Sequence, residues 1–454
     1  MSSRLAARRA AVIAGLLFAA LVPAACGGDG APSSGVPVGT VPPETGTPPT
    51  APTEPTTPST LNIVLGRPTD SSIAASVLAD PGTEVYFEYG TAPATYTGQT
   101  LVEMFNADLY AVNVRNAAAR QPDLYVALGD DFSIEKLIEQ NSLTQEAVDQ
   151  VYRYQRTYFG LLGGGSSLFL VNGNHEQAAG YLLGDRYNTP YRNAPVFAGR
   201  ARVTYFPLPA PDGFYSGDTM QVPGVGLVRD YYAFEWGDAL FVVIDPYWHS
   251  PVPVDNGVPG VEKTKDAWEA TIGDEQYAWF KKVLETSRAK YKFVFEHHVL
   301  GTGRGAAALV HTYEWGGYNR NGTAYEFSSL RRNWAKPIHR LMEDIKVTIF
   351  FFGHDHLFTR EKVDGVVYQE VPNPADNTYT AFNADAYNPA TISLPGANYD
   401  ATYGVIMPNS GYLDVTVSPD RVTVSYIRAV LPGDEAKAGA TNGAVGYSYS
   451  VSAR

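Results

Sequence analysis

The sequence predicts a layered α/β fold of the α+β type with a buried sheet, and three observations support this prediction. Short, almost continuously apolar runs recur along the chain, as is typical of strands buried on both faces. Between them lie longer segments whose apolar residues recur at helical spacing. Apolar residues make up 44% of the chain and charged residues 18%, within the globular range. We therefore expect helices packed on the faces of a sheet.

Residues 1–26 are typical of an export signal. Arg4, Arg8 and Arg9 precede the apolar run Ala10–Val22, which is too short to span a bilayer, and small residues then lead to Cys26. This arrangement resembles a bacterial lipoprotein signal, so we expect export to the cell envelope or extracellular face, with lipidation of Cys26 anchoring the chain to the membrane. The alternative is an ordinary cleavable signal with an incidental cysteine. With one cysteine in the chain, no intrachain disulfide or thiolate zinc cluster can form.

Two regions separate this signal from the main domain. Residues 27–60 are rich in Pro, Thr and Gly and cannot bury a core, which predicts a disordered linker. Residues 61–100 contain short strand-like runs, but too few for a complete β-sandwich. We expect a partial sandwich of the immunoglobulin or fibronectin kind. Its runs are Asn62–Leu65, Ser72–Val77 and Glu84–Tyr89, with Pro81-Gly82 as a turn.

Residues 101–430 form the predicted main domain. A helix over 107–120 ends before Gln121-Pro122, because proline disfavours helix in the residue before it. A second helix is expected over 146–162, a third is capped by Asp274, and a fourth covers 338–344. The expected strands are Leu124–Leu128, Ser167–Val171, Ala239–Asp245, Lys292–Phe295 and Val347–Phe352. Period-two alternation predicts an edge hairpin of Tyr412–Val417 and Arg421–Ile427, followed by a tail over 431–454.

Polar residues able to bind metal follow four of these strands. Ligands bind beyond the carboxyl ends of strands in open α/β folds, and a glycine allows the chain to turn sharply there. The mixture of carboxylate, amide and imidazole suits zinc, manganese or iron. The four motifs are Gly129-Asp130-Asp131, Gly173-Asn174-His175-Glu176, Glu296-His297-His298 and Gly353-His354-Asp355-His356. Five of the eight histidines lie in them, and His249, His311 and His339 are expected to be surface or packing residues.

The net charge of −13 argues against general nucleic-acid binding, which needs a basic surface. It does not exclude a small phosphoester substrate, because bound cations can reverse the local field.

The order Gly-Asp, Gly-Asn-His-Glu, His-His, Gly-His-x-His resembles that of the calcineurin-like metallophosphoesterases. The β-region ahead of it is similar to the N-terminal domain of the purple-acid-phosphatase-like and PhoD-like branches, and the resemblance covers about residues 61–430. It implies a β-sandwich flanked by helices with two metals about 3.5–4 Å apart, drawn from Fe, Zn or Mn. The implied function is phosphoester hydrolysis, as a phosphatase or phosphodiesterase, by a metal-bound hydroxide.

The resemblance also implies a role for each motif residue. Asp130 would bridge the two metals, Asn174, His297 and His354 would complete one site, and His356 would belong to the other. His175 would contact the phosphoryl oxygens or protonate the leaving group. Arg304, Tyr313 and Arg320, in a Gly-rich and aromatic-rich segment, are candidate substrate contacts, although long loops also carry such residues for packing.

One family motif is missing. The Asp-x-His expected at the end of the first core strand does not occur before Asp130, and no apolar strand lies ahead of the helix at Ala107. We infer that a segment near Gln99–Val102 is absent; the alternative is that Glu103, Asp108 or Asp131 supplies the lost ligands. Loss of these ligands weakens binding of the second metal, so a single bound metal is the alternative to two for this chain. The alternative function is therefore a non-catalytic or impaired surface lipoprotein that retains the fold.

Overall fold

The computed structural model describes residues 61–67, 74–79, 105–299, 305, 309–387 and 404–453. Cys26, Arg304, Glu103, the linker over 27–60 and the third strand of the β-region therefore lie outside the described residues. Among the described helices, none has the length and apolar content needed to cross a bilayer.

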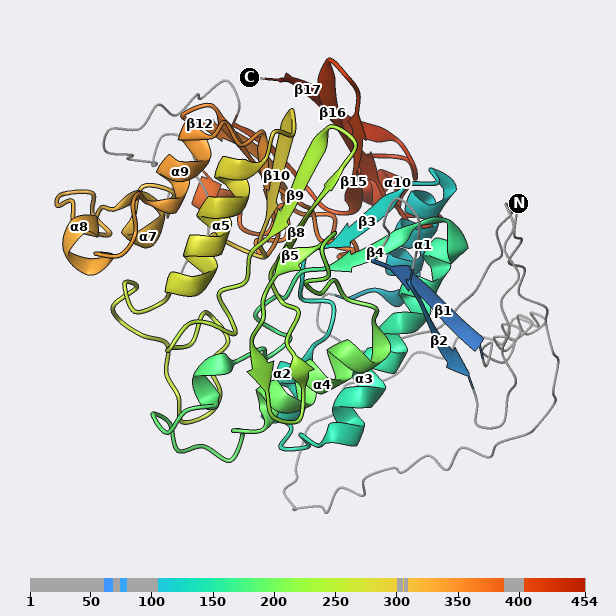
Figure 1. The fold of residues 1–454 in the computed structure, drawn as a ribbon. Coiled ribbons are helices and arrows are strands. Elements are labelled where there is room, and N and C mark those ends of the chain that lie inside the picture. The colour runs from blue at the N-terminus through green and yellow to red at the C-terminus, as the bar shows by residue number, and fades with distance from the viewer. Residues whose placement is uncertain are drawn as a thin grey trace, which may run out of the picture. The chain divides into compact units, whose positions relative to one another are not determined.

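The centre of the fold is a mixed sheet of eight strands (Figure 1). Strands β9, β10, β11 and β13 run parallel, and the others join antiparallel. In spatial order the strands are β14 (Val405–Met407), β12 (Phe358–Val363), β13 (Val366–Glu370), β11 (Ile349–Phe352), β10 (Tyr291–Phe295), β9 (Ala239–Val243), β8 (Tyr232–Trp236) and β5 (Ser216–Gly217). Because parallel strands end at one edge, the motifs after β10 and β11 come together there.

Smaller sheets complete the strand content. Their members are the parallel pair β3 (Leu124–Ala127) and β4 (Ser167–Leu170), the antiparallel set β15 (Gly411–Val417), β16 (Arg421–Arg428) and β17 (Val445–Ser452), and the pairs β1 (Leu61–Gly66) with β2 (Ala74–Ala79) and β6 (Gln221–Val222) with β7 (Gly226–Leu227). Strand β17 corrects the expectation of a tail over 431–454, because its period-two pattern pairs with β16 through nearly its whole length.

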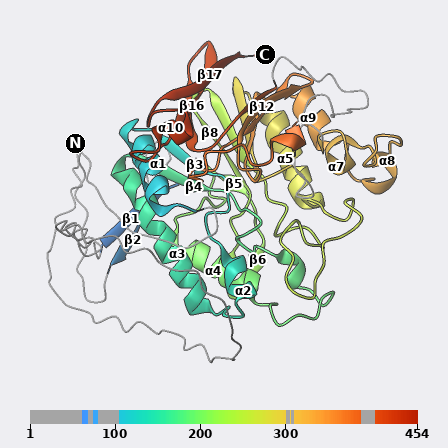
Figure 2. The same ribbon diagram turned by 180° about the vertical axis from the view of Figure 1, so that it is seen from behind.

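Helices flank the sheets on both sides (Figures 1 and 2). They are α1 (Ala107–Ala119), α2 (Ile134–Glu139), α3 (Gln145–Phe159), α4 (Ala194–Tyr205), α5 (Asp274–Thr286), α7 (Tyr313–Gly316), α8 (Phe327–Leu330), α9 (Ile338–Asp344) and α10 (Glu435–Ala438), with 3-10 turns η1 (Gly160–Gly165), η2 (Gly180–Leu182) and η3 (Ala384–Tyr387). Side chains cap the N-termini of α1 and α3. Asn106 accepts a hydrogen bond from the Leu109 N–H, and Thr144 accepts one from the Ala147 N–H.

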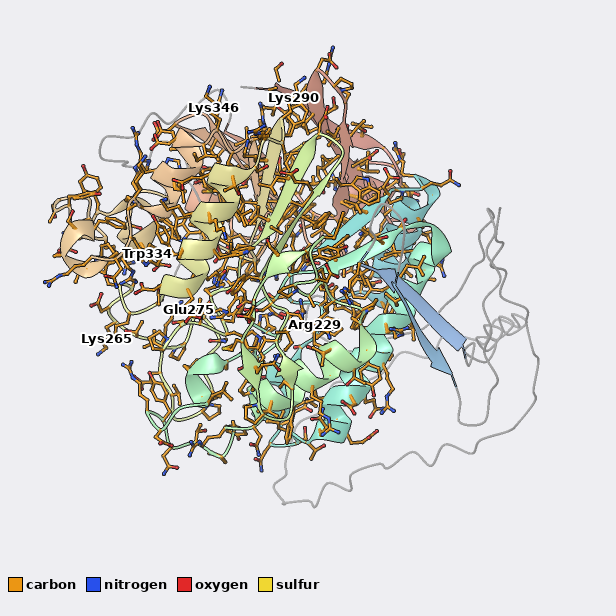
Figure 3. The ribbon with its side chains drawn as sticks, in the orientation of Figure 1. Arg229, Lys265, Glu275, Lys290, Trp334 and Lys346 are labelled. Carbon is orange, nitrogen blue, oxygen red and sulfur yellow. The ribbon has the colours of Figure 1, made fainter. Side chains whose placement is uncertain are left out.

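The start of α5 differs from the sequence prediction. Gly273, at φ 82°, is the cap, and Asp274 is the first helical residue. The Asp274 carboxylate is instead bonded by Asn333 and by the indole Nε1 of Trp334, at 2.9 and 2.7 Å. Trp334, labelled in Figure 3, stacks on Tyr277 of α5. A tertiary contact thus outcompetes the local cap.

Alternation of side chains along the strands divides the core into layers. On one face of the main sheet, Val294 and Phe350 pack with Phe280 of α5 and residues of α9. On the other face, Phe293 and Phe351 pack against residues of β4, β16 and β17. Helices α1, α3 and α4 cover the outer side of β3 and β4, where β1 also packs through Val64. The result is a β-sandwich flanked by helices, which confirms the predicted fold class.

Candidate metal centre

The turns after β3 and β4 bring the first two motifs together. Gly129 has φ +96°, and a Cβ on it would lie 2.5 Å from the Gly173 nitrogen, so the two turns touch backbone to backbone. Asp130 follows in the left-handed region, at φ 63°. This close approach, which only glycine permits, lets the chain turn at the end of β3, and the Asp130 carboxylate faces His297.

Glu176 holds both turns in place. Its buried carboxylate accepts hydrogen bonds from the backbone N–H groups of Asp130 at 3.0 Å, Asp131 at 2.8 Å and Gly173 at 2.6 Å. Glu176 is the last residue of the Gly-Asn-His-Glu motif, but no role was predicted for it from the sequence. The position of Glu176, three residues after Gly173, could have indicated the bond to the Gly173 N–H, because so short a turn brings the carboxylate back over that N–H.

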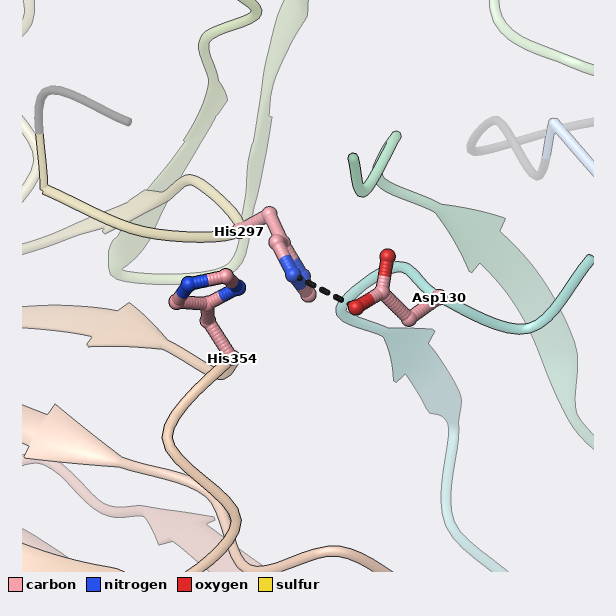
Figure 4. A group of neighbouring side chains, drawn as sticks. All are labelled: Asp130, His297 and His354. Carbon is pink, nitrogen blue, oxygen red and sulfur yellow. Dashed lines mark ion pairs between the residues drawn. The ribbon is translucent and has the colours of Figure 1, made fainter. Parts of the chain in front are cut away.

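The strongest indication of a cation lies between Asp130 and His297 (Figure 4). Nε2 of His297 lies 3.0 Å from Oδ2 of Asp130, but without hydrogen-bond geometry. Nδ1 of His297 is 2.7 Å from the Leu128 carbonyl, to which it donates. A neutral ring held in this way points its Nε2 lone pair at a carboxylate, and the two repel unless a cation lies between them.

The electrostatic environment of Asp130 and His297 favours a positive charge between them. Burial alone opposes ionisation, yet His297 and His175 lower the pKa of Asp130 well below its usual range. Burial likewise disfavours a charged His297, but the Asp130 carboxylate raises the pKa of this ring. In the metal-free chain a proton can serve as the cation that a metal would replace.

His354 joins this pair to a second group. Asp130, His297 and His354 offer ligand atoms within 4.8 Å of one another, and so do Asp255, His298 and His354. Nε2 of His354 lies 3.3 Å from Oδ2 of Asp255, while its Nδ1 lies 3.1 Å from Oδ1 of Asn174. Two adjacent positions for cations therefore share one imidazole.

Two members of the second group, His298 and Asp255, were not predicted as metal ligands from the sequence. His298 was noted only as part of the His-His pair; its Nδ1 lies 2.8 Å from the Tyr247 hydroxyl, and its Nε2 is buried without a hydrogen-bond partner. Asp255 lies in the loop after β9, where no metal-binding motif marks it. Lys263 also bonds Asp255 at 2.6 Å, so a cation at this position competes with an ammonium group.

A cavity of about 1730 Å³ opens beside the cluster. It runs between β3 and β15, and its lining includes Tyr125 and Leu413 from these strands and Phe295 and Phe351 from the main sheet. Within the described part of the chain, β3 hydrogen-bonds only β4, and β15 only β16. Two strands therefore face an apolar space with one edge each unpaired, and the metal cluster lies in its lining.

The family model for calcineurin-like phosphoesterases matches residues 99–358, more than half of the chain. The chain belongs to this family. The match spans all four strand-end motifs, and members of the family normally bind two transition-metal ions. No curated protein gives a significant match.

Solved structures that resemble this phosphoesterase chain include three named phosphatases or relatives. A purple acid phosphatase from yellow lupin (Lupinus luteus) seeds is 15% identical with a TM-score of 0.42, over 77% of this chain and 49% of its own. PhoD is 14% identical with a TM-score of 0.48, over 84% of this chain and 73% of its own. A dimetal phosphatase from Danio rerio is 14% identical with a TM-score of 0.37, over 76% of this chain and 89% of its own. The chain thus spans about half the length of the lupin enzyme, and these likenesses concern the fold alone.

Of the expected metal-site residues, Asp130, His297 and His354 form one group. His175 packs against the centre: its Nδ1 bonds Glu135, and its Nε2 lies 3.8 Å from Asp130. The amide oxygen of Asn174 faces His354 and so orients that ring. His356 lines the cavity but belongs to neither three-residue group among the described residues.

The other expected residues lie elsewhere. Tyr313 and Arg320 are not among the residues that line the cavity, and Tyr313 packs edge-on against Trp268 instead. Asp108 and Asp131, considered as replacement ligands, belong to neither metal group. The Tyr110 hydroxyl donates to Asp131 at 3.2 Å; burial, aided by the nearby Glu176 carboxylate, raises the pKa of Asp131 to about 8. A carboxyl group that tends to stay neutral is a poor metal ligand.

Proposed function

We propose that this chain is a metal-dependent phosphoester hydrolase that acts through the cluster of Asp130, His297 and His354. The observation that carries the proposal is the inward-facing Nε2 of His297, 3.0 Å from a carboxylate with which it makes no hydrogen bond. Asn174 orients His354, and the Leu128 carbonyl orients His297. Two imidazoles with a carboxylate are a donor set for zinc, iron or manganese.

Each nearby residue has a defined part in this proposal. When bound, the cations would neutralise charge on the phosphoryl oxygens and activate the attacking water. Glu135 fixes the tautomer of His175 by bonding its Nδ1. Burial disfavours the charged ring, but Asp130 and Glu135 together raise the pKa of His175 to about 9. With Nδ1 bonded to Glu135, Nε2 of His175 is the ring atom that can donate a proton to the leaving oxygen.

The direct test is hydrolysis of an aryl phosphate and a bis-aryl phosphate by the purified chain supplied with zinc, iron or manganese. We expect His354→Ala to reduce metal content and to lower turnover by at least about a hundredfold, because it removes a ligand shared by both groups. His249→Gln is the matched control, since His249 bonds Asp230 outside the cluster. Equal turnover in wild type and His354→Ala would contradict the proposal, and the ratio of the two substrates separates monoesterase from diesterase.

A second candidate, a surface lipoprotein with the fold but an impaired centre, is favoured by the cavity between β3 and β15. It lies where the absent strand with its Asp-x-His would end, and the remaining second position depends on Asp255, already paired with Lys263. This candidate predicts one metal or none per chain and no turnover. Two tightly held metals with turnover, measured by elemental analysis beside the hydrolysis assay, would exclude it.

We also propose that the chain is exported and anchored through lipid on Cys26. Support comes from the sequence of residues 1–26 alone. In a bacterial host, Cys26→Ala should move the protein from the membrane fraction to a soluble one. An unchanged distribution of the variant would leave the ordinary cleavable signal as the better interpretation.

A further inference from the structure

A second cluster of metal-binding side chains lies outside the centre described above. His311 precedes α7, His339 lies in α9, and Asp364 is in the turn between β12 and β13. One ligand atom of each lies within 4.8 Å of the others. Three separate segments of the chain therefore converge on one point.

This cluster and the main centre are at opposite ends of the sheet. Strand β13 runs parallel to β11, with Ile349 opposite Val367 and Phe352 opposite Glu370. Asp364 precedes β13, whereas the Gly-His-x-His motif follows β11. The six residues of β12 lie between His356 and Asp364, a span of roughly 20 Å for an extended strand. One ion cannot serve both places.

The distances match a tetrahedral ion. Nε2 of His311 is 3.5 Å from Oδ2 of Asp364, and Nε2 of His339 is 3.2 Å from the same oxygen. Zinc–ligand bonds of about 2.0–2.1 Å at a tetrahedral angle place neighbouring ligand atoms about 3.4 Å apart. The third separation, between the ligand atoms of the two imidazoles, is within 4.8 Å, so the three atoms can surround one ion.

His311 has no other explanation in the described structure. Its side chain is 10% exposed, and its Nε2 is buried without a hydrogen-bond partner. A buried polar nitrogen left in this way costs free energy that a bound cation would recover. The nitrogen lies 3.5 Å from Oδ2 of Asp364, which supplies the negative charge.

His339 is held as metal-binding histidines usually are. Its Nδ1 lies 2.7 Å from the buried hydroxyl of Tyr368, which fixes the ring while Nε2 faces Asp364. Nε2 of His339 and Oδ2 of Asp364 form a hydrogen bond of 3.2 Å, which satisfies His339 without a metal but leaves Nε2 of His311 without a hydrogen-bond partner.

In the comparable group of Asp218, Asp230 and His249, the imidazole has no buried Nε2 without a hydrogen-bond partner. Nε2 of His249 lies 2.7 Å from Oδ2 of Asp230, an ordinary hydrogen bond that satisfies the ring. The imidazole of that group is paired, although Oδ2 of Asp218 and Oδ1 of Asp230 are buried without hydrogen-bond partners, and we make no metal proposal for it.

We propose that His311, His339 and Asp364 bind a zinc ion, with water as the fourth ligand. Two imidazoles and one carboxylate suit this ion better than magnesium or calcium. The ion ties the β12–β13 turn to α9 and to the segment before α7, and so stabilises one margin of the core beneath α5 and α9. This site does not depend on the proposed hydrolytic function.

Cobalt provides the test, because tetrahedral cobalt(II) absorbs visibly and occupies zinc sites. The full-length chain, stripped by a chelator, is titrated with cobalt and then displaced with zinc. Asp364→Asn keeps the turn residue polar and tolerant of a positive φ, and we expect it to lose one tetrahedral cobalt per chain. Asp420→Asn, in the exposed turn of the β15–β16 hairpin, is the matched control and should bind as wild type does.

His354→Gln separates this site from the main centre, because it should retain the cobalt that Asp364→Asn loses. Equal cobalt binding and equal zinc-induced rise in Tm for wild type and Asp364→Asn would overturn the proposal. If Asp364→Asn does not fold, His311→Gln is tested in its place, and we expect it also to lose one tetrahedral cobalt per chain. It removes a nitrogen that has no hydrogen-bond partner, so a folded protein is expected.

Discussion

Glu176 shows how one side chain determines the geometry of the centre. Its two oxygens accept from the N–H groups of the turns after β3 and β4, and these turns carry Asp130 and His175. The carboxylate touches neither His297 nor His354 within the described hydrogen bonds. It positions the ligands and need not bind metal itself.

Glu176→Gln should therefore destabilise the protein and displace Asp130. An amide places an N–H donor where the turns offer only donors, which costs about 1–3 kcal/mol for the lost or opposed hydrogen bonds. Urea unfolding measures the loss, and cobalt binding at the main centre should weaken in parallel. Glu139→Gln, in an exposed ion pair with Lys136, is the control. Unchanged stability and metal affinity in Glu176→Gln would show that the clamp is dispensable.

At the scale of elements, buried titratable groups connect the edge of the main sheet to the loop after β9. Asp218 follows β5, Asp230 precedes β8, and His249 bonds Asp230 at 2.7 Å. Burial and the Asp230 carboxylate raise the pKa of Asp218 to about 7 from 3.8. Although burial opposes it, Asp230 also raises the pKa of His249 to about 9 from 6.5.

Both shifts make stability fall as pH rises. A raised folded-state pKa means that the native state binds more protons than the unfolded chain, so the stabilisation is complete below the unfolded pKa. The stabilisation from Asp218 is lost between pH 3.8 and about 7, and the stabilisation from His249 is lost between pH 6.5 and about 9. The loss of one folded-state proton in each range is the signature to look for.

Asp218→Asn should flatten the fall in stability over the lower of these ranges, because the amide does not titrate and can donate to Asp230. Urea midpoints measured across the two ranges give the profile. Asp185→Asn, with a fully exposed side chain, should leave the profile as in wild type. Parallel profiles for Asp218→Asn and wild type would contradict the assignment.

At the scale of the whole molecule, the space between β3 and β15 interrupts the second layer of the sandwich. The main sheet is continuous, but the layer packed on it consists of the pair β3–β4 and the set β15–β17, with the cavity of about 1730 Å³ between. An unpaired strand edge leaves backbone groups without ladder partners. A strand inserted there would pair with both edges and end beside Asp130.

Insertion of an apolar strand ending in Asp-x-His between Thr100 and Leu101 should thus raise both stability and metal content. We expect a higher Tm and a gain of one tightly bound metal per chain, measured by calorimetry and elemental analysis. An insert of equal length made of Gly and Ser before the same Asp-x-His is the control. Equal Tm and metal content for the two inserts would argue that the cavity does not accept a strand.

Local sequence patterns were sufficient for most elements and for the order of the motifs. Apolar runs predicted β3, β4, β9, β10 and β11 to within a few residues, because strands buried on both faces must be apolar throughout. Polar ligands placed directly after apolar runs predicted the strand ends at which Asp130, His297 and His354 meet. Helix α9 matches its predicted bounds, residues 338–344.

Only the tertiary structure decided which distant residues complete each cluster. Asp255 reaches His354 and Asp364 reaches His311 through loops and turns, whose sequences carry no periodicity to place them. The choice of Gly273 over Asp274 as the cap of α5 likewise depended on Trp334, about sixty residues away. The sequence determined the strands and their ligands, because burial acts on each residue locally; long-range packing decided the partners, because it depends on how the strands are arranged.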